Sequence, residues 1–180
     1  TAEAGVVTFP PWAGITLHAA PMQAGGASLD WLARLLGQKA ADLAQGAAEI
    51  TATSPLFLPH LQGERAPFWD AALRGTFAGL SGATGPAELT AAVLEGVAFS
   101  ARLALEALER SGGVVPDRIR TGGGGAASDR WCQIRADALN RPMDRVQGRD
   151  PGALGAAVMA GAGIGAMADL ATAAAALVQT

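Results

Sequence analysis

The stretch TGGGGAASDRW, residues 121–131, places four consecutive glycines between a short strand-like run and a helix-like run. We predict a strand near 118–121 and a helix from about Ser128 to Leu139, so the glycines form the turn between them. Such a turn lets backbone N–H groups approach a phosphate or a nucleotide, because glycine has no Cβ that would hold the ligand away. A plain turn that needs one positive φ angle would use the same residues, so the glycines alone leave both interpretations open.

Strand and helix signals alternate on both sides of this turn. The remaining predicted strands lie near 6–9, 15–18, 56–58, 75–79 and 143–146, and the remaining helices over 28–36, over 87–110 and from 151 onward. This alternation predicts an α/β fold, and without a repeat or a linker we expect one domain over residues 1–180. The helix over 87–110 is apolar almost all round, which predicts that it is buried.

Residue types at the helix ends refine these predictions. Ser28 is the predicted N-cap of the helix that ends at Gly37, and Asp30 is expected in its first turn, where the helix dipole favours an anion. Asp150 is predicted to cap a helix that has Pro151 at its first position.

The overall composition excludes several classes of protein. Half of the 180 residues are hydrophobic, 16% are charged and the formal net charge is -3, which argues against disorder and against a nucleic-acid partner. One cysteine and two histidines support neither a disulfide framework nor a Cys/His metal cluster. We therefore expect a reducing, cytoplasmic setting, and we assign no metal ligand.

Residues 151–168 carry no charge, and 12 of these 18 residues are glycine or alanine. The length is that of a membrane span, but glycine and alanine gain little on transfer into lipid, so a buried, closely packed helix is expected instead. Because the chain begins at Thr1 without a methionine or a signal-peptide pattern, we expect it to be a piece of a longer protein.

A dinucleotide-binding fingerprint is one alternative for the glycine turn. Gly122, Gly124 and Ala127 satisfy G-x-G-x-x-A, and Asp144 lies 20 residues after Gly124, as that fingerprint requires. The preceding run, DRIRT, is polar for the buried first strand of such a fold, and it lies late in the chain. This interpretation is therefore the second choice.

The order of five segments supports a different family. These are QAGGASLDWL, LPHLQGERAPFWDAALRGTFAGL, LEGVAFSARLALEAL, TGGGGAASDRWCQIRADALNRPM and DPGALGAAVMAG. Together they resemble the C-terminal lobe of the FGGY carbohydrate kinases, with most likeness to the xylulokinase branch, over about Leu17 to Ala168. The most specific motif combines Gly75, Phe77 and Gly79–Leu80 with Glu88–Leu89 and 92–95.

The resemblance implies a ribonuclease-H-like, actin-like ATPase lobe, with a mixed sheet flanked by helices, that binds ATP and Mg²⁺. It implies that the lobe faces an N-terminal lobe carrying the sugar site and the catalytic aspartate, and that the ATP γ-phosphoryl group passes to a sugar or polyol hydroxyl. No residue of this chain matches the catalytic position. We therefore expect the chain alone to be inactive and to bind ATP weakly; its oligomeric state stays open, a homo-oligomer included.

The family's nucleotide-contacting stretches match this sequence in two places. Asp30 stands where glycerol kinases have glutamine, and Asp129 where they have asparagine; a carboxylate can accept hydrogens from the adenine amino group or a ribose hydroxyl. Either aspartate could instead serve only the start of its helix. The resemblance assigns nucleotide contact to Gly26, Asp30, Gly123, Gly124, Gly125, Ala126 and Asp129.

Other notable residues are interpreted structurally. Glu64, Arg65, Asp70 and Arg74 match a family motif, and we expect them to tie strands together. The tryptophans at 12, 31, 69 and 131 are expected to be core or loop anchors, and Cys132 a small buried side chain. A third functional alternative is a non-catalytic module that kept the fold and lost the nucleotide.

Overall fold

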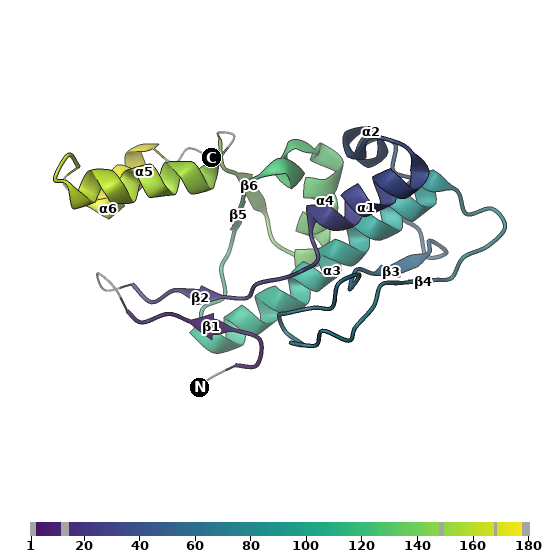
Figure 1. Cartoon of the computed structure of the whole chain (residues 1–180), viewed down its shortest axis with the longest axis horizontal. Coiled ribbons are helices and arrows are strands. Elements are labelled where there is room, and N and C mark those ends of the chain that lie inside the picture. The colour runs from purple at the N-terminus through teal and green to yellow at the C-terminus, as the bar shows by residue number, and fades with distance from the viewer. Residues whose placement is uncertain (1–2, 12–14, 148–149, 168, 178–180) are drawn as a thin grey trace.

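The computed structural model describes residues 3–11, 15–147, 150–167 and 169–177 (Figure 1). Its strands are β1 (Val7–Thr8), β2 (His18–Ala19), β3 (Leu56–Leu58), β4 (Thr76–Ala78), β5 (Ile119–Thr121) and β6 (Met143–Arg145). Its helices are α1 (Gly26–Leu36), α2 (Ala40–Gln45), α3 (Pro86–Gly112), the 3₁₀ turn η1 (Gly124–Ala127), α4 (Asp129–Leu139), α5 (Pro151–Gly163) and α6 (Leu170–Leu177).

Helix α3 is the element against which most others pack. It contacts α1, α2, α4 and β3, and Figure 1 shows α1, α2 and α4 above it and β3–β4 below it. Pro86 is at its first position, one residue before the predicted start, and the Glu88 carboxylate accepts the Gly85 N–H at 2.9 Å. Leu94 is fully buried, whereas Phe99 is 44% exposed, so the predicted burial all round holds only for one face.

The strands form three separate two-stranded sheets. β1 pairs antiparallel with β2, β3 pairs antiparallel with β4, and β5 pairs parallel with β6. The parallel pair is joined by η1 and α4, which makes a β–α–β unit with the glycine turn directly after β5. The α/β class is therefore confirmed, with parallel and antiparallel pairing in different parts of the chain.

Helix ends agree with most predictions and differ at α1. Gly37 ends α1 with φ 66°, and the Asp150 side chain accepts the Ala153 N–H at the start of α5. Ser28 is not the N-cap of α1: the helix begins at Gly26, and Ser28 is buried at its third position. Asp30 consequently lies beyond the first turn, so it cannot serve the helix start as predicted.

The prediction of a buried helix over 151–168 is wrong. α5 packs against α6 at one end of the molecule (Figure 1), and Val158 is its buried residue. Met159 is 61% and Ile164 82% exposed. Ala168 lies outside the described residues. None of the described helices is long and apolar enough to cross a membrane.

Tryptophans occupy three different environments. Trp131 is buried, and its Nε1–H donates to the Leu94 carbonyl of α3 at 3.2 Å. Trp31 stacks on Phe57, with the ring centroids 6.0 Å apart. Trp69 is 55% exposed, so of the two predicted roles, core anchor or loop anchor, it does not have the first. Residue 12 lies outside the described part of the chain.

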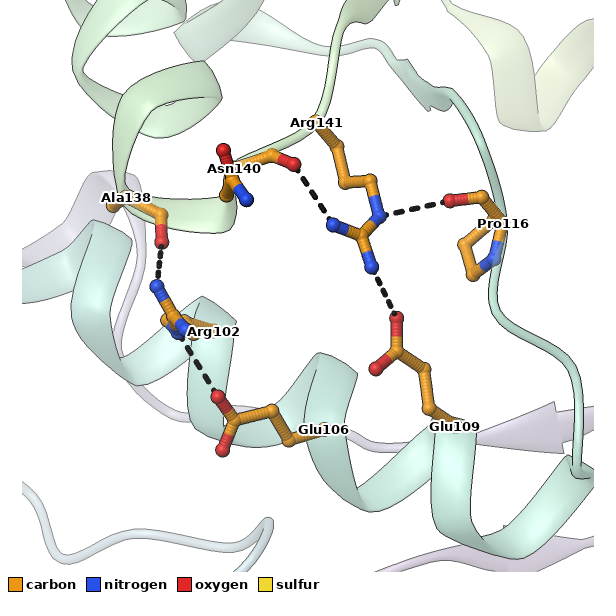
Figure 2. A network of polar contacts seen from close by, with 7 residues as sticks. All are labelled: Arg102, Glu106, Glu109, Pro116, Ala138, Asn140 and Arg141. Atoms are coloured by element: carbon orange, nitrogen blue, oxygen red, sulfur yellow. Dashed lines mark hydrogen bonds and ion pairs between the residues drawn. The ribbon is translucent and has the colours of Figure 1, made fainter.

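An arginine network joins the second half of α3 to the end of α4 (Figure 2). Arg141 donates from Nε to the Pro116 carbonyl at 3.0 Å and pairs with Glu109 at 3.5 Å. Arg102 donates to the Ala138 carbonyl at 3.0 Å and to Glu106 at 2.9 Å. One guanidinium group thus binds a carbonyl in the last turn of α4, and the other binds a carbonyl in the segment before β5.

The contact between α3 and β3 depends on Gly96. A Cβ added there would overlap the Phe57 carbonyl oxygen, which is backbone and cannot rotate away. We expect Gly96→Ala to lower the free energy of unfolding by roughly 1–3 kcal/mol, measured by urea denaturation. Gly155→Ala in α5 is the matched control: no described atom lies within 4 Å of its added Cβ, so stability should stay equal or rise.

Candidate functional site

Contacts and backbone geometry within the protein explain why three of the four residues in the turn after β5 are glycine. Gly123 has φ +78°, which favours glycine. A Cβ on Gly122 would lie 2.8 Å from Pro151 Cγ, and one on Gly125 would lie 3.2 Å from the Trp131 ring. Gly124 differs from these three: its φ is not positive, and no described atom lies within 4 Å of an added Cβ.

Side chains of α4 and of its N-cap residue fix the position of the turn. Ser128 caps α4 by accepting the Trp131 N–H at 3.2 Å. Arg135 donates to the Gly125 carbonyl at 2.9 Å and to the Thr121 hydroxyl at 3.1 Å, with its guanidinium over the Trp131 ring. Cys132 is buried, as predicted, and contacts the Ala126 carbonyl. The turn is thus fixed at both its ends.

A cavity of about 780 Å³ lies between this turn and α1 and α2. The chain brings its walls together from four elements that are far apart in sequence: α1, α2, η1 and α4. Its lining residues are Gly26, Leu29, Asp30, Ala40, Ala41, Ala44, Gln45, Gly124, Gly125, Ala127, Ser128, Asp129, Arg130 and Trp131.

Five of the seven residues assigned to nucleotide contact line this cavity. They are Gly26, Asp30, Gly124, Gly125 and Asp129. Gly123 and Ala126 do not line it, because Gly123 precedes η1 and Ala126 is buried behind the turn.

Helix α2 is the wall that the sequence did not reveal. Its alanines and Gln45 carry no motif, and the link between α2 and the glycine turn exists only in the folded chain. A short, alanine-rich helix of this kind suits a cavity wall, because its small side chains leave room.

Three charged side chains line the cavity, and two of them, Asp129 and Arg130, are paired within the protein; the third is Asp30. Asp129 pairs with Arg145 at 2.5 Å, and its hydrogen bond is the main cause that raises the pKa of Arg145. Arg130 donates to the Ala48 carbonyl at 2.8 Å and to Glu49 at 3.0 Å. Among the described lining residues the polar groups are therefore mainly acceptors, which suits a ligand that presents amino or hydroxyl hydrogens.

The side chains of Asp70 and Arg74 bind backbone groups of their own loop between β3 and β4, so they do not tie strands together as predicted. Glu64 is buried and accepts two backbone N–H groups, and Asp70 accepts the Ala72 N–H at 2.7 Å. Arg74 donates to the carbonyls of Ala71 and Leu73.

Comparison with known proteins agrees with this geometry. The model of the FGGY family of carbohydrate kinases, C-terminal domain, matches residues 14–164. The glycerol kinase of Aromatoleum aromaticum is 39% identical over 144 residues, which are 78% of this chain and 29% of that protein. The xylulose kinase of Staphylococcus epidermidis is 35% identical over 157 residues, covering 84% and 30%.

A solved structure shows the same fold. The ligand-bound xylulose kinase from Lactobacillus acidophilus superposes with a TM-score of 0.82 at 31% identity, covering 97% of this chain and 36% of that one. The fold and the site together define the class of this protein as an α/β lobe with a cavity lined by glycines. The chain belongs to the FGGY family of carbohydrate kinases and corresponds to its C-terminal domain. It spans about 30% of the length of the curated relatives that it matches.

This family excludes the dinucleotide-binding interpretation. Asp144, which that interpretation would place on a ribose, forms a two-bond ion pair with Arg118 and does not line the cavity. The hydrogen bond from Arg118 lowers the pKa of the Asp144 carboxyl. Asp144, whose position suggested the fingerprint, instead joins β6 to the residue before β5.

The hold of Arg135 on the glycine turn gives a test of the site's rigidity. We expect Arg135→Ala to speed amide hydrogen exchange at 123–125 about tenfold, because two charge-assisted hydrogen bonds are lost. Arg135→Lys should not restore protection, since one ammonium cannot replace the fork that spans Thr121 and Gly125. Arg102→Ala is the control, and equal acceleration in that variant would contradict the assignment.

Proposed function

We propose that this chain is the ATP-binding lobe of a sugar or polyol kinase, and that the cavity between α1, α2, η1 and α4 holds the adenosine part of ATP. The family and the named relatives support a kinase that uses a hydroxyl acceptor. The relatives' names give glycerol and xylulose as acceptor classes, and this chain's acceptor belongs to the same class of polyols and sugars.

One observation supports the nucleotide assignment. Two glycines that line the cavity are required neither by their backbone angles nor by a close neighbour in the protein. Gly26 and Gly124 have no positive φ, and no described atom lies within 4 Å of a Cβ added to either. Glycine at the first turn of α1 costs stability relative to alanine. Both residues face the same cavity from different elements, so the open backbone fits the close approach of a ligand.

The polar lining fits the nucleoside end of ATP. Asp30, Asp129 and Gln45 offer acceptors for the adenine amino group and the ribose hydroxyls. The cavity volume of about 780 Å³ lies in the range of roughly 300–1,000 Å³ that is typical of small-molecule sites. Arg130 is the one cation among the described lining residues, and it is already bound to Glu49 and to the Ala48 carbonyl. We therefore assign no lining cation to the phosphates, and we place the phosphate end of ATP toward the second lobe.

The rest of the catalytic machinery belongs, in this proposal, to an N-terminal lobe of the same kinase. The γ-phosphoryl group supplies the electrophile, and a carboxylate of that lobe accepts the proton of the attacking hydroxyl. Mg²⁺ binds mainly through phosphate oxygens with one or two carboxylates, and the described residues of this chain hold no cluster of three or more metal-ligating side chains.

Two further assignments accompany this proposal. Residues 1–180 act as one domain, and the kinase works in the cytoplasm, where ATP and reduced thiols are available. A non-catalytic module that lost its nucleotide is the competing function; it predicts that alanine at the two open glycines has no effect on any ligand.

The two open glycines provide the test of nucleotide binding. We expect Mg-ATP to shift the amide NMR signals of Gly26 and Gly124, and Gly26→Ala and Gly124→Ala to weaken that binding at least about tenfold. Gly26→Ala should at the same time keep or raise the melting temperature, because alanine favours the helix. Stability and affinity are thereby separated.

Gly155→Ala in α5 and Gly82→Ala between β4 and α3 are the matched controls, since each added Cβ also meets open space away from the cavity. Both should keep full affinity. Wild-type signals that do not move with millimolar Mg-ATP, or cavity variants that bind like the wild type, would rule out the proposed site.

The second prediction concerns catalysis. We expect the chain alone to release no ADP in a sugar-dependent manner, because the base and the sugar site belong to the other lobe. Coupled-enzyme detection of ADP with glycerol and with xylulose measures this. Sustained turnover by a preparation free of other kinases would show that the proposed division between two lobes is wrong.

A further inference from the structure

The segment that leads into α1 is held by a buried carboxylate in another loop. Glu64 lies between β3 and β4, and its side chain has no solvent exposure. Its Oε1 accepts the backbone N–H of Gln23 at 2.6 Å and that of Arg65 at 2.9 Å. One carboxylate oxygen therefore joins two parts of the chain that are 41 residues apart.

A second hydrogen bond joins the same two segments. The Ala66 N–H donates to the Pro21 carbonyl at 2.9 Å, and Ala66 is almost fully buried. The segment 21–23 is therefore held at a donor and at an acceptor two residues apart. Such a two-point contact fixes the direction of the chain as well as its position.

The loop that carries Glu64 is itself closed. Glu64 and Asp70 exchange both backbone hydrogen bonds at 2.9 Å. Gly63, with φ +78°, lies so close to the Ala71 backbone that an added Cβ would be 2.7 Å from its Cα. The carboxylate thus comes from a rigid support.

Helix α1 has no side-chain cap at its start. Its N-cap, Gly25, has no side chain, and no side-chain hydrogen bond caps the first turn. Two residues separate Gln23 from Gly26, which is the first residue of α1 and lines the cavity. The segment before it therefore supplies a restraint on this turn that no side-chain cap provides.

We propose that Glu64 is a positioning residue for the nucleotide cavity: through the Gln23 N–H it fixes the place of the Gly25–Gly26 turn. The inference rests on the proposed function for the identity of the ligand, but the position of the turn can be measured without any ligand. Glu64 touches no nucleotide; it acts through the backbone of the segment 21–23.

The second carboxylate oxygen of Glu64 faces His60 but makes no hydrogen bond to it. Glu64 Oε2 lies 3.4 Å from His60 Nδ1, and the His60 ring packs edge-on against Phe68. A glutamine at position 64 would keep a carbonyl oxygen for the two N–H groups and turn its amide toward that nitrogen. Glu64→Gln is therefore the conservative variant that should rescue the positioning.

The decisive experiment compares Glu64→Ala, Glu64→Gln and Glu109→Ala in the 180-residue chain. Glu109→Ala removes a partly buried carboxylate that pairs with Arg141 at the far end of α3 (Figure 2), so it is the control for lost stability. We expect only Glu64→Ala to move the free-state amide signals of Gly25 and Gly26 and to speed their hydrogen exchange at least about tenfold. With Mg-ATP, the same variant should bind about tenfold more weakly, and Glu64→Gln within about twofold of the wild type.

The outcomes separate the two proposals. If Glu64→Ala lowers the melting temperature as Glu109→Ala does, but leaves the Gly25 and Gly26 signals and the affinity unchanged, Glu64 is only structural and the inference is wrong. If the wild type does not bind Mg-ATP, the proposed function fails, and the free-state signals still decide whether Glu64 positions the turn. If Glu64→Ala does not fold, Glu64→Gln decides the question. This variant keeps the acceptor oxygen, so a loss of the Gly25 and Gly26 signals in it would overturn the inference.

Discussion

The close contact between Gly96 of α3 and the Phe57 carbonyl of β3 is the constraint on which the site depends. It sets how near β3 can lie to α3, and so it places the loop after β3, which carries Glu64. Two residues earlier on α3, the Leu94 carbonyl accepts the Trp131 indole N–H and so fixes α4. One short stretch of a single helix therefore determines the positions of both sides of the cavity.

Local sequence signals predicted most of the helix ends of this fold, but they did not predict the short helix α2. Gly37, Pro86 and Pro151 mark helix ends through backbone geometry that needs no tertiary information. Ser28 misled for a physical reason: it is a good capping residue, but the packing of α1 buries it inside the helix. The run from 151 misled because apolar composition predicts burial only where a partner is present, and α5 has α6 alongside it rather than a core.

The candidate site was predictable to the extent that it lies in two glycine stretches. Gly26 and Gly124 come from segments that the family resemblance matched, and the structure brings them to one cavity. The contributions of α2 and Arg135 could not be predicted, because they arise from contacts between distant segments. The glycine run also proved to be mixed, since Gly122, Gly123 and Gly125 have reasons within the protein, and the sequence alone cannot tell these from Gly124.

Cys132 is the single thiol of the chain, and it lies 7% exposed directly behind the glycine turn, in contact with the Ala126 carbonyl and the Arg135 guanidinium. Because the thiol is buried against the turn, movement of the turn away from α4 would expose its sulfur to a reagent. The rate at which Cys132 is alkylated in the unmodified protein therefore reports how often the turn opens. A bound ligand that holds the turn closed would lower this alkylation rate.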